Sequence, residues 1–129
     1  PNLEHTLNLL SDPEKLWSPH GILSLSRKDP LFGKGEDYWR GHIWLNINFL
    51  VVSSLHRYAY SPDLAGPYSQ RAAELYTKLR SNLVDNVFSQ YKTTGYLWEQ
   101  YSAENGRGRR SHPFTGWTAL IVLIVAGVY

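Results

Sequence analysis

Residues 69–91 read SQRAAELYTKLRSNLVDNVFSQY, and this stretch predicts one long amphipathic helix. Its apolar side chains recur at steps of three and four residues, which brings them to one face of a helix. Glu74 and Lys78 form a favourable i,i+4 pair away from that face, and Gly95 predicts the end of the helix because glycine readily adopts the left-handed C-cap conformation. The predicted buried stripe consists of Ala72, Leu75, Tyr76, Leu79, Leu83, Val87 and Tyr91.

A second long helix is expected from Ile43 to Tyr58, followed by a connection rich in proline and glycine. Residues 3–10 predict a shorter helix, and Asp12 before Pro13 has the pattern of a further helix start. Residues 17–38 predict a long irregular loop, residues 96–101 a short extended segment and residues 103–113 a polar loop. The stripe expected on the second helix is Ile43, Ile47, Leu50, Val51, Leu55 and Tyr58.

These elements predict an all-α fold built from helix hairpins, with short extended pieces and large loops at one end. The chain has 129 residues, enough for one modest core. Five Trp and nine Tyr exceed what such a core needs, and the excess favours a surface on which flat rings stack. The net charge of +2 is spread along the chain, so we expect no nucleic-acid partner.

The chain ends in an apolar run, residues 118–129. It holds about 12 residues, whereas a membrane-spanning helix needs about 20. We therefore expect Thr118–Tyr129 to be a helix buried on all sides, and any membrane anchor to lie outside this segment. A chain of this size could hardly bury such a run alone, which suggests that residues 1–129 are a segment of a larger domain.

Glu99 is the leading candidate for a catalytic group because it stands alone among aromatic residues, in Tyr96-Leu97-Trp98-Glu99-Gln100-Tyr101. A carboxyl group buried beside aromatic rings is expected to have a raised pKa and to serve in proton transfer. Aromatic faces also stack on the C–H faces of sugar rings, so Glu99 is a candidate for one half of a carboxylate pair in glycoside hydrolysis. A structural glutamate paired with an arginine remains the alternative.

The segment from Gly35 to Asn46 holds the strongest cluster of candidate binding residues. Trp39 could stack on a sugar, Arg40 could bind hydroxyls through its planar fork, and Gly41 would permit a close approach. Trp44 is expected on the first helical turn. The alternative is that Trp39 and Trp44 both belong to the core and that Arg40 is a structural ion-pair partner. Phe114 and Trp117, in the turn after His112, complete the set of candidates.

Other chemistries lack support in the sequence. The five His show no HxxH, HxxxH or HExxH spacing, so no metal site is expected. No P-loop or GxGxxG is present, and we expect no cofactor. Glu36 and Asp37 are expected to be a helix-start charge pair or part of a solvated face, and Arg107–Arg110 to be a solvated loop.

Four ordered motifs resemble the C-terminal part of glycoside hydrolase family 63, the family of the processing α-glucosidases. They are Ser18–Ser26 (SPHGILSLS), Tyr38–Asn48 (YWRGHIWLNIN), Trp98–Tyr101 (WEQY) and Phe114–Thr118 (FTGWT). The resemblance covers nearly the whole chain. His42 stands where many family members have proline, which affects loop stiffness rather than chemistry.

The resemblance implies that residues 1–129 are part of a single (α/α)6 toroid whose helix ends surround a pocket. It implies an inverting enzyme that removes the terminal α-1,2-linked glucose from the N-glycan precursor. Its general base would be Glu99, and its general acid an aspartate in the rest of the catalytic domain. The implied location is the lumen of the endoplasmic reticulum, as a type II membrane protein. The segment alone is expected to be inactive.

Two alternatives follow from the same residues. One is a trehalase-like or other toroidal α-glycosidase, because the YWRG-x-x-W element is shared more widely. The other is a sugar-binding remnant that holds its ligand on Trp39, Trp44 and Trp117 without turnover.

Overall fold

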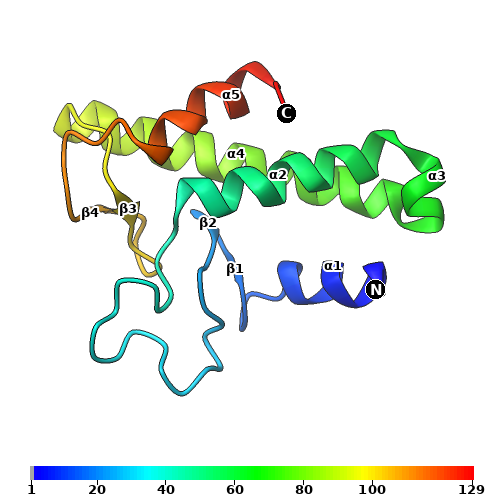
Figure 1. The fold of residues 1–129 in the computed structure, drawn as a ribbon, viewed down its shortest axis with the longest axis horizontal. Helices are drawn as coiled ribbons and strands as arrows, with labels where there is room; N and C mark the ends of the chain where they lie inside the picture. Colours follow the sequence, from blue (N-terminus) through cyan, green and yellow to red (C-terminus); the bar gives the residue numbers. More distant parts are fainter. Residues whose placement is uncertain (1) are drawn as a thin grey trace.

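The computed structural model describes residues 2–129, so Pro1 of the expected segment lies outside the described residues. Two long helices, α2 (Leu45–Tyr60) and α4 (Ser69–Thr94), run antiparallel and side by side (Figure 1). A short helix α3 (Pro62–Ala65) and a 3₁₀ turn η1 (Gly66–Tyr68) join them. Helix α1 (Leu3–Ser11) lies on one side of the pair and α5 (Ile121–Ala126) on the other. The predicted all-α fold class is confirmed.

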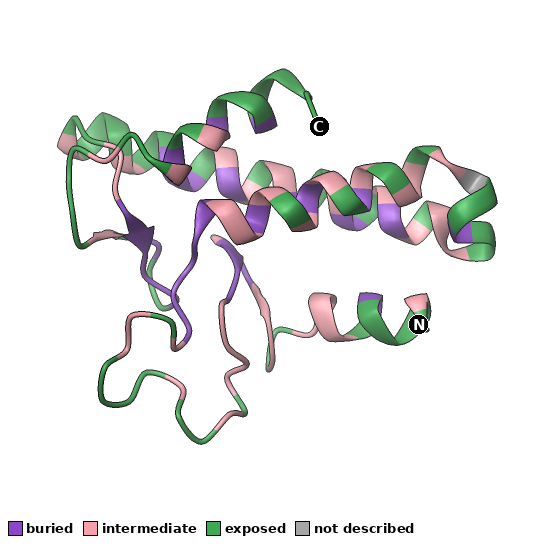
Figure 2. Cartoon of the chain, in the orientation of Figure 1, coloured by how far each residue is buried: buried purple, intermediate pink, exposed green. Residues whose placement is uncertain are grey.

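Helix α4 follows its sequence pattern closely. Its inward side chains Ala72, Leu79 and Leu83 are fully buried against α2, as the purple segments of the two helices show in Figure 2. Gly95 ends the helix with a left-handed φ of 79°, and its N–H donates to the carbonyl of Tyr91 at 2.7 Å. The predicted C-cap is therefore confirmed.

Helix α2 begins two residues later than predicted because Ile43 is held in an extended conformation. The Ile43 N–H donates to the Tyr101 carbonyl at 2.9 Å, and the Ile43 carbonyl accepts from the Tyr101 N–H at 3.0 Å. The predicted stripe is also wrong in phase, since Leu50 is 65% exposed. The face that is buried consists of Leu45, Asn48, Val52 and Leu55.

Asn48 explains the shift in phase. Its side-chain oxygen accepts from the Ile22 N–H at 2.7 Å, and its amide donates to the carbonyls of Ile22 at 3.0 Å and Trp44 at 2.8 Å. A buried amide is stable when its donors and acceptors are satisfied in this way. Asn48 therefore fastens the start of α2 to the hairpin of β1 (Trp17–Ser18) and β2 (Gly21–Ile22).

A second hairpin, β3 (Gln100–Tyr101) with β4 (Gly108–Arg109), lies at the same end of the helix pair (Figure 1). Ile43 bridges the two hairpins, because its backbone pairs with both Leu23 and Tyr101. The long loop before Ile43 lies below the two hairpins in the view of Figure 1. This end of the α2–α4 pair is thus built from two stretches that are far apart in sequence, residues 17–43 and residues 100–109.

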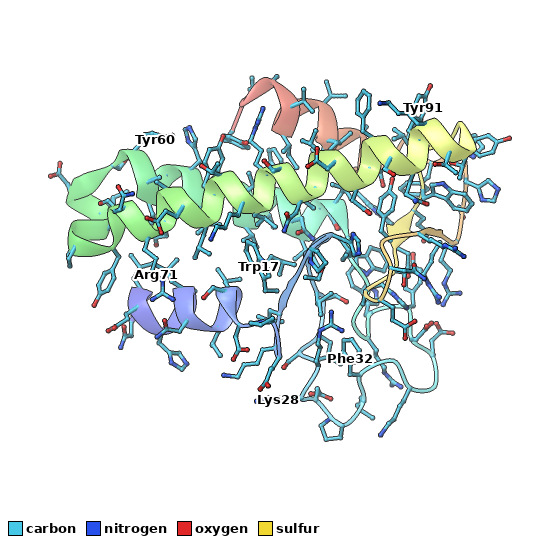
Figure 3. The ribbon with its side chains drawn as sticks, turned by 180° about the vertical axis from the view of Figure 1, so that it is seen from behind. Trp17, Lys28, Phe32, Tyr60, Arg71 and Tyr91 are labelled. Atoms are coloured by element: carbon cyan, nitrogen blue, oxygen red, sulfur yellow. The ribbon has the colours of Figure 1, made fainter. Side chains whose placement is uncertain are left out.

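The expected helix start at Asp12 is wrong. Residues 13–16 form turns, in which the Asp12 side chain accepts from the Glu14 N–H at 2.9 Å and the Asp12 carbonyl accepts from Lys15, Leu16 and Trp17. Aspartate favours such turns as readily as it caps helices. Helix α1 itself is held to α4 by Arg71, labelled in Figure 3, whose Nη2 donates to Ser11 Oγ at 3.2 Å.

The C-terminal run is not one buried helix. It forms a 3₁₀ turn η2 (Trp117–Leu120) and then α5, which buries only Ile121 and Ile124 against the helix pair. Val122 is 65% exposed and Val125 is 47% exposed. Among residues 2–129, nothing covers the outer side of α5 (Figure 2). Burial on all sides therefore stays a prediction that requires further helices of a larger domain. Within residues 2–129, no helix has the length and apolar character that crossing a membrane requires.

Candidate active site

Glu99 lies where the two hairpins meet the C-terminal turn, and the residue is only 9% exposed. Its backbone is fixed from two directions. The Glu99 N–H donates to the Ser111 carbonyl at 3.0 Å, and the indole Nε1 of Trp117 donates to the Glu99 carbonyl at 2.7 Å. These two hydrogen bonds fix the backbone of Glu99 between the second hairpin and the C-terminal turn.

The two carboxylate oxygens of Glu99 each accept one hydrogen bond from a distant segment. The Tyr38 hydroxyl donates to Oε1, and the Ser111 N–H donates to Oε2 at 3.1 Å. Each carboxylate oxygen has more than one lone pair, so both oxygens can accept a further hydrogen bond. Glu99 is therefore held firmly and still has the capacity to bind a water molecule.

The pKa of Glu99 is lowered, contrary to the expectation from its aromatic surroundings. The hydrogen bond from Tyr38 has the largest effect and outweighs burial, which acts in the opposite direction. The Ser111 N–H and the charge of Arg110 lower the pKa of Glu99 further. The hydrogen bonds that stabilise the ionised form of Glu99 thus have a larger effect on its pKa than desolvation has. Glu99 is therefore a carboxylate at neutral pH and is suited to accept a proton.

Trp39 and Trp44 form a stacked pair next to Tyr38, the tyrosine that donates to Glu99. Their ring centroids are 3.7 Å apart and their planes differ by 8°. Trp39 is 50% exposed, whereas Trp44 is fully buried beneath it. Tyr38 packs edge-on against Trp44 at 4.6 Å. Trp44 therefore supports Trp39 from below rather than facing a ligand itself, and Trp39 offers an open aromatic face.

The candidates from the C-terminal turn join the same aromatic cluster. Trp117 lies 5.3 Å from Trp44 and 4.7 Å from Phe114, measured between ring centroids. The Phe114 ring also covers Gly116, where an added Cβ would lie 2.7 Å from the ring. The structure thus brings together Glu99, Trp39, Trp44, Phe114 and Trp117, as expected for residues that meet at one end of a helix hairpin.

Arg40 and Gly41 make contacts within their own loop, and their expected roles in sugar binding stay predictions. The Arg40 guanidinium donates to the Lys34 carbonyl at 2.7 Å, which joins the two ends of the turn formed by residues 34–40. Gly41 has φ 121°, and a Cβ there would lie 2.4 Å from the Phe32 ring. The close approach that Gly41 permits is therefore that of Phe32, whose place in the loop is labelled in Figure 3.

A group of charged residues borders the site. The sequence predicted Glu36 and Asp37 as a helix-start charge pair or part of a solvated face, and Arg107–Arg110 as a solvated loop. Asp37 Oδ2 pairs with His42 Nε2 and with Arg109 Nη2, both at 2.9 Å, and Asp37 Oδ1 pairs with Arg110 Nη2 at 3.1 Å. The hydrogen bond to His42 and the two arginine charges lower the pKa of Asp37. Glu36 Oε1 also accepts from Arg110 at 3.0 Å. The adjacent acids and the Arg-rich loop are therefore partners of each other.

Tyr38 and Ser111 are the residues of the site that sequence reasoning missed. Tyr38 stands in the same motif as Trp39, and a tyrosine between an acid and a tryptophan was the available signal. Ser111 acts through its backbone N–H, which no side-chain pattern could reveal. Within residues 2–129, no three His, Cys, Asp or Glu side chains gather closely enough to hold a metal ion.

Residues 1–127 match the glycosyl hydrolase family 63 C-terminal domain, and the chain belongs to this family.

Named relatives of this chain include three glucosidases. The chain is 48% identical over 128 residues to the probable mannosyl-oligosaccharide glucosidase of Schizosaccharomyces pombe, which covers 98% of this chain and 16% of that protein. It is 48% identical over 128 residues to the mannosyl-oligosaccharide glucosidase of Saccharomyces cerevisiae, covering 97% of this chain and 15% of that protein. It is 42% identical over 134 residues to mannosyl-oligosaccharide glucosidase GCS1 of Arabidopsis thaliana, covering 100% of this chain and 15% of that protein. The chain thus spans about a sixth of the length of these relatives.

Proposed function

We propose that this segment supplies the general base and part of the sugar-binding surface of an inverting α-glucosidase that removes the terminal α-1,2-linked glucose from the N-glycan precursor. The observation that carries the proposal is the Glu99 carboxylate, buried, ionised and held by Tyr38 and Ser111 beside the open face of Trp39. The family and the names of the relatives support the choice of reaction and substrate.

In the proposed reaction, Glu99 takes a proton from a water molecule as that water attacks the anomeric carbon of the glucose. Inversion requires a second carboxyl group on the opposite side of the sugar, about 6.5–9.5 Å from the base, to protonate the leaving oxygen. We assign this general acid to an aspartate in the rest of the catalytic domain. Trp39 would stack on a sugar ring, while Trp117 and Phe114 shape the wall nearest to Glu99.

The rest of the catalytic domain is the proposed partner of the exposed apolar side of α4 and α5. Phe88, Val122 and Val125 are about half exposed or more, and they border one groove between these helices. In water, such a continuous apolar surface is costly, and packing against further helices of a toroid would bury it. We place the intact protein in the lumen of the endoplasmic reticulum as a type II membrane protein, with its anchor outside this segment.

The direct test is an assay of the intact protein on a triglucosylated N-glycan and, separately, on trehalose. The proposal predicts release of one glucose from the glycan, and proton NMR of the first product should show the β-anomer that inversion of an α-linkage yields. Turnover of trehalose in place of the glycan would instead identify a trehalase-like enzyme. Binding of the glycan without turnover would identify a sugar-binding remnant.

A further inference from the structure

The two hydrogen-bond donors on Glu99 have a feature in common. Tyr38 and Ser111 come from segments far apart in sequence, and the residue before each of them is charged. Those two preceding residues, Asp37 and Arg110, form an ion pair of 3.1 Å between Oδ1 and Nη2. One ion pair therefore joins the two segments immediately next to the groups that hold the carboxylate.

Arg110 occupies an unusual backbone conformation. Its φ is 66°, in the left-handed region that residues with a Cβ rarely adopt. Gln100 pairs with Arg109, but the Glu99 N–H bonds to Ser111, so the pairing shifts by one residue and Arg110 is the extra residue, as in a β-bulge. Such a bulge redirects the next residue, which here aims the Ser111 N–H at the Glu99 carboxylate.

The Arg110 side chain also touches the other donor. Its guanidinium lies over the Tyr38 ring, with the central carbon 5.2 Å from the ring centroid. This cation–π contact adds to the ion pair in fixing how the tyrosine ring lies. Arg110 therefore acts on both donors at once, through its backbone on Ser111 and through its guanidinium on Tyr38.

Asp37 is anchored independently of Arg110. Its other oxygen, Oδ2, is held by His42 Nε2 and Arg109 Nη2, both at 2.9 Å. His42 is itself 8% exposed. These contacts hold the Asp37 carboxylate in place. Arg110 therefore pairs with a carboxylate of fixed position and not with a mobile one at the surface.

We propose that the Asp37–Arg110 ion pair positions the general base, by holding the Tyr38 hydroxyl and the Ser111 N–H on the two oxygens of Glu99. The proposal rests on the proposed role of Glu99 as the base. Asp37 and Arg110 are positioning residues and touch no substrate in it. Small displacements of a catalytic group cost much of the rate, so loss of the pair should lower kcat while substrate binding survives.

The test is Arg110→Gln in the intact protein, with Arg107→Gln as its matched control. Arg107 is exposed in the same loop, and its side chain makes no hydrogen bond or ion pair within the described part of the chain. We expect Arg110→Gln to lower kcat by on the order of 10- to 100-fold, the cost of a small misplacement. KM should stay close to that of the control, and Arg110→Lys, which keeps the charge but loses the planar fork, should fall between the two.

The pH profile separates positioning from a purely structural role. Tyr38 and Arg110 are the ionisable side chains that act on Glu99 among residues 2–129, and both lower its pKa. Removal of Arg110 should therefore move the acid limb of kcat/KM to higher pH, whereas Arg107→Gln should leave it in place. A fall in kcat with an unmoved acid limb and a matching loss of thermal stability would overturn the proposal.

Two further variants complete the experiment. If the two residues act together, the combined loss in Asp37→Asn with Arg110→Gln should be clearly smaller than the product of the two single losses; fully multiplied losses would count against the pair. Glu99→Gln is measured in parallel. An inactive Glu99→Gln together with an Arg110→Gln that behaves like its control would reject the positioning role and leave the general base intact. An active Glu99→Gln would reject the base itself.

Discussion

Trp39 lies flat on Trp44, with 3.7 Å between the ring centroids, yet the two residues differ completely in exposure. Trp44 is fully buried and Trp39 is 50% exposed. The sequence could not separate the two rings: Trp44 belongs to the core, whereas Trp39 keeps an exposed face, as its proposed role in sugar binding requires.

Replacement of Trp44 by alanine should destabilise the protein strongly. Truncating a buried tryptophan costs about 3–5 kcal/mol, because apolar contacts are lost and a cavity remains. Trp39→Ala should cost much less stability but raise KM for the glycan, since it removes the open face. Denaturant unfolding and steady-state kinetics on both variants test this division; equal stability losses would contradict it.

Tyr38→Phe removes the hydroxyl that donates to Glu99 Oε1 and leaves the ring in place. Because that hydrogen bond is the main cause of the lowered pKa of Glu99, the pKa should rise in the variant. The carboxylate would then protonate at a higher pH, and the acid limb of kcat/KM should move to higher pH. Because the pKa of Glu99 is lower in the folded protein than in the unfolded chain, ionised Glu99 stabilises the fold above its unfolded pKa. This stabilisation is lost as the pH falls through the folded pKa. Tyr38→Phe should therefore make the free energy of unfolding depend less on pH in this range. An unmoved acid limb would show that the activity reports another group.

Gly41→Ala should be destabilising for two separate reasons. At φ 121° a side chain is strained, and its Cβ would meet the Phe32 ring at 2.4 Å. Gly33→Ala is a matched control, because Gly33 also has a positive φ of 65° but has nothing within 4 Å of the added Cβ. We expect the control to lose about 1–2 kcal/mol from backbone strain alone and Gly41→Ala to lose clearly more. Thermal unfolding measures both, and combining Gly41→Ala with Phe32→Ala should recover part of the loss.

Features that depend on neighbouring residues could be predicted from the sequence, whereas features that depend on contacts between distant segments could not. Helix α4 and its C-cap at Gly95 follow from a periodic stripe and one glycine, both of which act within a few residues. The buried face of α2 could not be found in this way. It includes Asn48, which is buried because its side chain hydrogen-bonds to the backbone of Ile22, 26 residues away. The outer side of α5 has the apolar character of a buried helix but lies exposed in the segment described here.

The site shows the same division. Glu99, Trp39 and Trp117 could be singled out by residue type, since a carboxylate among aromatic rings is a local pattern. The lowered pKa of Glu99 could not, because Tyr38 lies 61 residues away and the Ser111 donor belongs to the backbone. The pairing of Asp37 with Arg110 crosses 73 residues and is equally invisible before folding.

The most direct test of the account is the Glu99→Gln variant of the intact protein, assayed on the triglucosylated glycan. Glutamine keeps the size and the hydrogen-bonding oxygen of the side chain but cannot take a proton from water. The account predicts that kcat falls by at least about 100-fold, the low end of the contribution of a general base, while glycan binding and thermal stability remain near those of the unmodified protein. A Glu99→Gln variant that turns over the glycan at close to the normal rate would contradict the assignment of Glu99 as the base.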